Sequence, residues 1–135
     1  MRPPIVAALL TAALLPLACG GDDEEPQRPP GRVQEVSTTI RAFEQATAKK
    51  DYDRICEEIF SEAVREQAGG RNCPKLLEQT SAGVRNPRIR VLEIEIEGNR
   101  ARARVRTRSS GQEPVEETLE LVREDGRYRV AALRR

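Results

Sequence analysis

The sequence contains no histidine and no tryptophan, and its aromatic residues are two tyrosines and two phenylalanines. The absence of histidine excludes Ser-His-Asp and Cys-His catalysis, histidine-containing zinc sites and an imidazole switch near neutral pH. Because aromatic side chains are scarce, the core must be built from aliphatic residues. With 135 residues, the chain is long enough for one domain and too short for two of ordinary size.

The chain also lacks an excess of charge, because 23 Lys and Arg residues are balanced by 22 Asp and Glu residues, for a net charge of +1. Such a balance is not typical of general nucleic-acid-binding proteins or of acidic tails. Gly-rich phosphate loops and clusters of Cys and His at metal-binding spacings are missing as well. We therefore expect no nucleic-acid partner, no metal and no cofactor.

The one long apolar run covers residues 5–18, and Arg2 is the only charged residue in the first eighteen. Fourteen residues form a helix of about 21 Å, which is shorter than the hydrocarbon core of a bilayer, about 30 Å. A basic start, an apolar centre and a small residue before the cleavage point are typical of export signals. We predict that residues 1–18 are a signal peptide and that the chain is exported.

The end of this segment, Leu15-Pro16-Leu17-Ala18-Cys19, resembles the lipobox of bacterial lipoprotein precursors. The resemblance implies cleavage before Cys19, lipidation of that cysteine, and anchoring on the outer face of the cytoplasmic membrane, in the cell envelope. Pro16 departs from the usual pattern, which leaves ordinary cleavage just after Gly20 as the alternative. Residues 19–31 would be the lipidated cysteine and a tether rich in acidic residues and proline, and residues 32–135 the folded domain.

Cys56 and Cys73 are the two cysteines that remain after Cys19. In an exported domain, two cysteines most simply pair with each other, and two buried free thiols are the alternative. A redox-active pair would be expected as C-x-x-C, which is absent. Sixteen residues lie between the two cysteines, so closing this loop is worth about 3 kcal/mol. We predict a structural disulfide.

The first part of the domain has helical periodicity. Apolar residues at spacings of three and four predict a helix over residues 33–48, and Asp51 is placed to cap a second helix over residues 52–60. Ser61 is expected to start a short turn that ends before Gly69-Gly70. A third helix is expected to begin at Asn72 or Cys73, with Pro74 in its first turn, and to end at residue 81.

After Pro87 the apolar period changes to two, which predicts strands. Gly98-Asn99 and Asp125-Gly126 mark two tight hairpins, which gives four antiparallel strands. The phase of the apolar residues slips between Val91 and Leu92, as a β-bulge would cause. We predict an α+β fold, in which N-terminal helices pack on a curved, mostly antiparallel four-stranded sheet.

The two hairpins predict definite cross-strand pairs, because a two-residue turn fixes the register of the strands that it joins. The first hairpin pairs the following residues: Glu97 with Arg100, Ile96 with Ala101, Glu95 with Arg102, Ile94 with Ala103, Glu93 with Arg104, and Leu92 with Val105. The second pairs Glu124 with Arg127, Leu121 with Val130, and Leu119 with Ala132.

Three segments resemble the nuclear-transport-factor-2-like (NTF2-like) family: Ala48-Lys49-Lys50-Asp51-Tyr52, the following Ile55-Cys56, and the closing stretch from Leu121 to Val130, which reads LVREDGRYRV. The resemblance covers roughly residues 33–133. It implies a cone-shaped sheet wrapped around a long helix, with a pocket at the open end. Many exported lipoproteins of this type, with a similar cysteine pair, have no assigned activity. Some other relatives are isomerases, dehydratases or cyclases that use Asp, Tyr or His in the pocket.

The sequence offers no convincing catalytic set. Asp51, Asp53 and Asp125 are explained as helix-capping and turn residues, and Tyr52 and Tyr128 as packing residues. We therefore expect a non-enzymatic binding or scaffolding domain whose partner is an unidentified protein or small ligand. A small-ligand carrier, or an enzyme of the isomerase or dehydratase kind, is the alternative. A pocket lined by Phe43, Tyr52 or Tyr128 with an acidic neighbour would favour that alternative, and a filled cone would disfavour it.

Four arginines alternate along one predicted strand: Arg102, Arg104, Arg106 and Arg108. We interpret them first as a solvated face, because the predicted register sets Arg102 opposite Glu95 and Arg104 opposite Glu93. The alternative is an anion-binding strip, since a row of guanidinium groups can bind phosphate, sulfate or carboxylate polymers.

Overall fold

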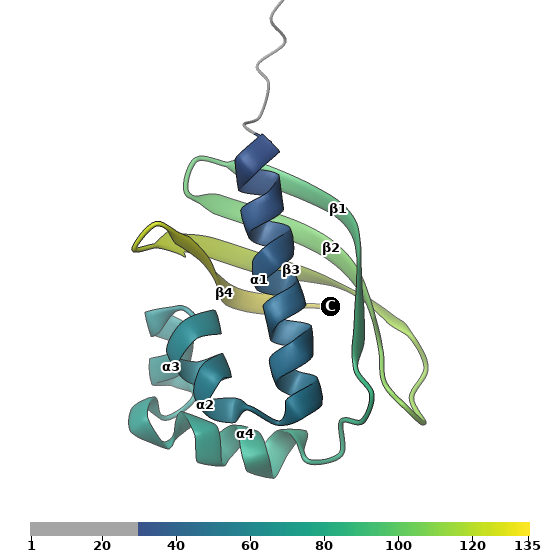
Figure 1. Ribbon diagram of the computed structural model, residues 1–135. Helices are drawn as coiled ribbons and strands as arrows, with labels where there is room; N and C mark the ends of the chain where they lie inside the picture. The colour runs from purple at the N-terminus through teal and green to yellow at the C-terminus, as the bar shows by residue number, and fades with distance from the viewer. Residues whose placement is uncertain (1–29) are drawn as a thin grey trace, which may run out of the picture.

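The computed structural model describes residues 30–135, in which helices come first and a single sheet follows (Figure 1). The helical part consists of α1 (Pro30–Lys49), α2 (Tyr52–Arg54), the π-helical turn η1 (Ile55–Ile59), α3 (Glu62–Gln67), the 3-10 turn η2 (Gly70–Asn72) and α4 (Cys73–Ser81). The strands are β1 (Arg88–Glu97), β2 (Arg100–Arg108), β3 (Val115–Glu124) and β4 (Arg127–Arg134). No helix of residues 30–135 is both long enough and apolar enough to cross a membrane.

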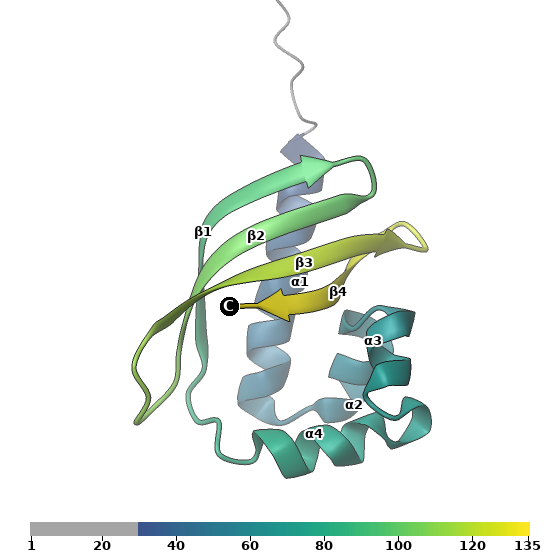
Figure 2. The same cartoon turned by 180° about the vertical axis from the view of Figure 1, so that it is seen from behind.

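The sheet is an antiparallel meander in the order β1-β2-β3-β4, and it curves around α1 (Figures 1 and 2). Both predicted hairpins are present. Gly98 and the pair Asp125-Gly126 adopt the positive φ angles, 58°, 50° and 75°, that such tight turns require. The predicted fold class, helices packed on a curved four-stranded antiparallel sheet, is confirmed.

The register of the first hairpin is as predicted from Glu97–Arg100 to Glu93–Arg104, and the bulge also lies where the apolar phase slips. One pair was wrong. Val105 is paired with Val91, and Leu92 is the extra residue of the bulge. A bulge places two residues of one strand against one of the other, so a slip between two apolar residues does not say which of them is paired.

The second hairpin is paired as predicted at Glu124–Arg127 and Leu121–Val130, but Leu119 is paired with Leu133 and not with Ala132. The pairing skips Ala131, which makes a second bulge in β4. Bulges bend a strand and increase its twist. The two bulges, in the two edge strands, therefore contribute to the curvature with which the sheet surrounds α1.

The core lies between α1 and the inner face of the sheet. Helix α1 contributes Val36, Ile40 and Ala46, which are buried. The sheet contributes the alternating residues Ala101, Ala103, Val105, Leu119, Leu121, Tyr128 and Val130. The side chain of Thr39 donates a hydrogen bond to the backbone carbonyl of Tyr128 at 2.9 Å, which joins α1 to β4. The helix starts at Pro30, so the last two residues of the predicted tether belong to it.

The segment predicted as one helix over 52–60 is a short α2 followed by the wider turn η1. Phe60 leaves the turn in an extended conformation and bridges to Val130 of β4. Ser61 then caps α3, and its Oγ accepts a hydrogen bond from the backbone N–H of Val64 at 3.3 Å. The helical segment that begins at Tyr52 thus ends where Phe60 attaches to β4, through a contact between residues distant in sequence.

Candidate functional site

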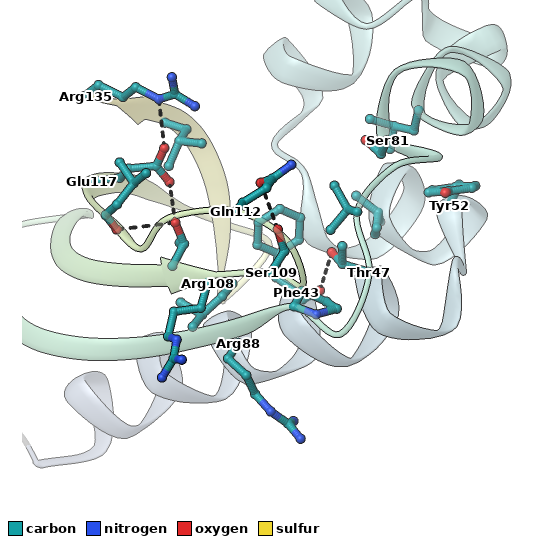
Figure 3. Close-up of a pocket in the computed structure, with 18 of the residues that line it drawn as sticks. Phe43, Thr47, Tyr52, Ser81, Arg88, Arg108, Ser109, Gln112, Glu117 and Arg135 are labelled. Carbon is teal, nitrogen blue, oxygen red and sulfur yellow. Dashed lines mark hydrogen bonds and ion pairs between the residues drawn. The ribbon is translucent and has the colours of Figure 1, made fainter.

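A cavity of about 320 Å³ lies at the end of the molecule where the C-terminal half of α1 meets α2, α4 and the starts of β1 and β3 (Figure 3). Its volume is at the lower end of the range for small-molecule sites. Half of its lining is apolar, from Phe43, Tyr52, Ile55, Phe60, Leu77, Val84, Pro87, Ile89, Val115 and Leu133. The other half is polar, from Thr47, Ser81, Arg88, Thr107, Arg108, Ser109, Gln112, Glu113, Glu117 and Arg135.

Two aromatic rings form part of the cavity wall. Phe43 extends from α1, and Phe60 comes from the segment that η1 delivers to β4. Their ring centroids lie 6.1 Å apart with the planes inclined by 52°, a tilted arrangement that aromatic pairs favour. The helical periodicity that points Phe43 toward the sheet therefore also sets one side of the cavity.

Glu117 brings a carboxylate to this apolar surface. It is 6% exposed, and it is the only buried acidic residue among residues 31–135. Its Oε2 accepts a hydrogen bond from Thr107 Oγ1 at 3.2 Å, and its Oε1 accepts one from Arg135 Nε at 3.1 Å (Figure 3). A buried carboxylate is costly unless it is paired and hydrogen-bonded, and these two donors supply that compensation.

The partner Arg135 is itself 81% exposed. The ion pair therefore joins a buried anion to a side chain that extends into solvent. Figure 3 shows the guanidinium groups of Arg88 and Arg108 extending away from the side chains around the cavity. Among the charged residues that line the cavity, Glu117 and Arg135 form an ion pair with each other.

Sequence reasoning missed Glu117, although a signal was present. The predicted pairs of Leu119 and Leu121 with apolar residues of the next strand put both leucines on one apolar face, and residue 117 has the same parity. Period-two alternation therefore places Glu117 inside as well. Thr107 follows Ala101, Ala103 and Val105 in the same way on β2.

The predicted packing and capping residues are found as follows. Asp51 caps α2 by accepting a hydrogen bond from the backbone N–H of Arg54 at 3.2 Å, and Asp125 lies in the second hairpin. Asp53 is exposed in α2. Tyr128 is buried in the core, whereas Tyr52 lines the cavity. A cavity lined by Phe43 and Tyr52, with Glu117 as acidic neighbour, is the arrangement that favours the alternative given above, a small-ligand carrier or an enzyme.

The arginine strip of β2 lies on the exposed face of the sheet. Arg104 forms an ion pair with Glu93 at 3.3 Å, and Arg106 forms one with Glu116. The hydrogen bond from Arg106 and its charge hold the pKa of Glu116 below its usual value. Arg102 lies between Glu95 and Glu120 in the register, but Arg108 is opposite another arginine, Arg88. Among residues 30–135, Arg108 is therefore the strip residue that has no acidic residue opposite it in the register.

Cys56 and Cys73 form the predicted disulfide, which joins η1 to the first residue of α4. Both cysteines are buried. The predicted signal peptide (1–18), the lipidation site Cys19 and residues 20–29 of the tether lie outside the described residues. Among residues 30–135, no group of three or more Cys, Asp or Glu side chains is arranged to hold a metal ion.

Neither a scan against family models nor a search of curated proteins finds a match for this chain. Solved structures do match. An NTF2-like protein of unknown function from Shewanella baltica OS155 aligns with a TM-score of 0.56 and 14% identity, over 78% of this chain and 92% of that chain. An NTF2-like protein of unknown function from Silicibacter pomeroyi DSS-3 aligns with a TM-score of 0.57 and 13% identity, over 77% of this chain and 93% of that chain.

A de novo designed protein with a curved β-sheet is also similar, with a TM-score of 0.51 and 18% identity, over 73% of this chain and 96% of that chain. At such identities the likeness concerns the fold and carries no activity or ligand with it. The helices, the curved four-stranded sheet and these neighbours together show that the chain has an NTF2-like fold.

Proposed function

We propose that this chain is an exported, membrane-anchored lipoprotein whose NTF2-like domain binds a small, largely apolar ligand without transforming it. The observation that carries the proposal is the cavity itself, a space of about 320 Å³ in which aromatic and aliphatic residues make up half of the lining and Glu117 supplies a buried carboxylate. Ligand sites commonly combine an apolar lining with a few placed polar groups.

The polar groups indicate how such a ligand would be oriented. An apolar body would contact Phe43, Phe60 and Ile89, and a hydrogen-bond donor on the ligand would be directed toward Glu117. A carboxylate has about four acceptor positions, and only two donors are in place at Glu117. A ligand donor can therefore join Thr107 and Arg135 there.

The same contacts support binding over catalysis. Both oxygens of Glu117 already accept hydrogen bonds, one of them from an arginine. General acid–base catalysis would require a carboxyl group that exchanges its proton with the substrate. The two tyrosines do not supply a second such group near Glu117, because Tyr128 is in the core and Tyr52 is on the helical side of the cavity.

The membrane anchor is supported by the sequence of residues 1–19, with its apolar run and lipobox-like end. Two or more acyl chains on one cysteine hold a protein at a membrane, whereas a single chain binds only marginally. In this proposal the domain presents its cavity outside the cytoplasmic membrane.

Thermal-shift screening of a soluble chain, residues 20–135, against small apolar compounds with and without an amine or hydroxyl group tests the proposal. A ligand at 100 times its Kd stabilises the fold by about 2.7 kcal/mol. Val115→Trp, in the cavity wall, should abolish the shift, because the larger side chain occupies the space. Leu76→Trp is the matched control, since Leu76 is 40% exposed, Val115 is 36% exposed, and Leu76 does not line the cavity.

Ligands recovered after incubation should be chemically unchanged by mass spectrometry. Conversion of the ligand would replace the binding function by an enzymatic one. Equal thermal shifts in the Val115→Trp and Leu76→Trp variants would show that the ligand does not bind in the cavity.

A further inference from the structure

Four arginines form a block on the exposed face of the sheet, at the end of β1 and β2 away from their hairpin. Arg88 of β1 lies opposite Arg108 of β2, and Arg90 lies opposite Arg106. All four side chains are exposed. We call these four residues the arginine block. It contains Arg106 and Arg108 of the strip predicted from the sequence, together with Arg88 and Arg90 of the neighbouring strand. Figure 2 shows this face of β1 and β2 toward the viewer.

Carboxylates neutralise only half of the arginine block. Arg106 is paired with Glu116, and Arg88 approaches Glu44 of α1 at 3.7 Å. Arg90 and Arg108 have no acidic partner within 4.0 Å among residues 30–135. At the other end of the same two strands, in contrast, the register sets Arg100, Arg102 and Arg104 opposite Glu97, Glu95 and Glu93.

The arrangement has no explanation in the stability of the sheet. Like charges directly opposite each other on antiparallel strands destabilise the pair, and here two such pairs are adjacent. The three glutamates of β1 show that this strand readily places acidic residues opposite the arginines of β2. The concentration of positive charge at one end is therefore a feature that an anionic partner would stabilise.

We propose that the arginine block binds an extended polymer that carries phosphate groups. Guanidinium groups donate paired hydrogen bonds that match the oxygens of phosphate. Residues two apart on a strand lie about 6.7 Å apart, and neighbouring strands lie about 4.8 Å apart, so the four groups form a patch along two strands that can contact more than one phosphate. Successive phosphates along one chain would contact them together.

The position of the block favours a polymer over the bilayer of the predicted anchor. The chain enters the domain at the N-terminus of α1, which is beside the β1–β2 hairpin, and the arginine block lies at the opposite ends of these strands (Figure 1). The arginine block therefore lies at the end of the two strands farther from the point where the chain enters the domain. Arg88 and Arg108 also line the cavity, but their guanidinium groups extend away from it (Figure 3), and Arg90 and Arg106 do not line it.

The test measures binding of inorganic polyphosphate to the full-length chain in a neutral detergent, with Arg90→Thr/Arg108→Thr as the variant. We expect at least a tenfold loss of affinity. We also expect a shallower slope of log K against log salt concentration, since each lost phosphate contact lowers the number of counterions released. Threonine keeps the preference for strand structure, so circular dichroism should be unchanged.

Arg100→Thr/Arg102→Thr is the matched control, because it removes the same charge from the same face of the sheet. It should retain affinity within about twofold. An equal loss of affinity in both variants would show that binding depends only on the net charge of the chain, and it would overturn the proposal. Absence of polyphosphate binding by the unmodified chain would overturn it too, and block-dependent sedimentation with phosphatidylglycerol vesicles in that case would assign the block to a bilayer.

Discussion

Thr107 on β2 donates a hydrogen bond across the sheet to Glu117 on β3, with 3.2 Å between Thr107 Oγ1 and Glu117 Oε2. The two residues are diagonal neighbours, because Glu117 is paired with Val105 and Thr107 with Val115. Both side chains face the inside of the sheet. The inward-facing residues before Thr107 on β2 and after Glu117 on β3 are aliphatic. The sheet thus changes from core to cavity wall at these two residues.

Replacing Glu117 by leucine should leave the free energy of unfolding unchanged or raise it by about 1 kcal/mol. Leucine removes the cost of burying a carboxylate and fills a similar volume, while the exposed Arg135 stays solvated. Leucine should, at the same time, abolish any preference of the cavity for ligands that carry an amine or hydroxyl group. Urea denaturation and thermal-shift screening of the same variant measure the two effects.

A loss of more than about 2 kcal/mol in this variant would assign Glu117 a structural role. Arg135→Ala provides the comparison, because it leaves the carboxylate buried without its charged partner. That variant should be less stable than Glu117→Leu.

Much of the fold could be predicted because turn residues and alternation agree. In the first hairpin, the Gly98-Asn99 turn and the contrast between glutamate and isoleucine in β1 permit one register only. In β4 that contrast disappears, since Ala131, Ala132 and Leu133 are all apolar. The bulge at Ala131 therefore had no signal, and the pairing of Leu119 was predicted one residue out of place.

The candidate site was predictable only in its individual residues. Alternation places Glu117 inside, and helical spacing places Phe43 toward the sheet, but neither indicates an unfilled space. The cavity arises where α4, the end of α1 and the starts of two strands meet. The contacts between these elements join residues distant in sequence and depend on the bulges and on the turn η1. Local patterns could therefore not predict that the elements leave a space between them.

The ion pair between Arg106 and Glu116 predicts a pH effect. The guanidinium of Arg106 holds the pKa of Glu116 below its usual 4.5 through a hydrogen bond and its charge, and Arg104 adds a smaller effect in the same direction. The contribution of this pair to stability should be complete above pH 4.5 and should disappear as the pH falls through the lowered pKa of the folded state. Carboxyl carbon NMR should therefore show a higher pKa for Glu116 in Arg106→Gln than in the unmodified chain.

Arg102→Gln is the control for this titration, because it removes an arginine of the same strand face that does not contact Glu116. Its Glu116 should titrate as in the unmodified chain. An unchanged Glu116 pKa in Arg106→Gln would contradict the ion pair.

The lipid anchor is tested by metabolic labelling with a fatty-acid probe. The unmodified chain should be labelled and should sediment with membranes, whereas Cys19→Ala should lose the label because it lacks the thiol that receives the lipid. Cys56→Ser/Cys73→Ser is the matched control for loss of cysteine and should keep the label. Equal labelling of Cys19→Ala and the unmodified chain would exclude Cys19 as the anchor, and an unlabelled, released product that begins after Gly20 would support ordinary cleavage.

The disulfide between Cys56 and Cys73 gives the most direct prediction of stability. It closes a loop with a sequence separation of 17 residues, which contains η1, α3 and η2 but no strand. Cys56→Ser/Cys73→Ser should therefore lower the free energy of unfolding by about 2–4 kcal/mol while the strand signal in circular dichroism persists. Chemical denaturation measures the loss, and alkylation of the unfolded, unreduced chain should find no free thiol at either position. An undiminished stability of the double variant would reject the structural role of the bridge, whereas two alkylatable thiols would exclude the bridge itself.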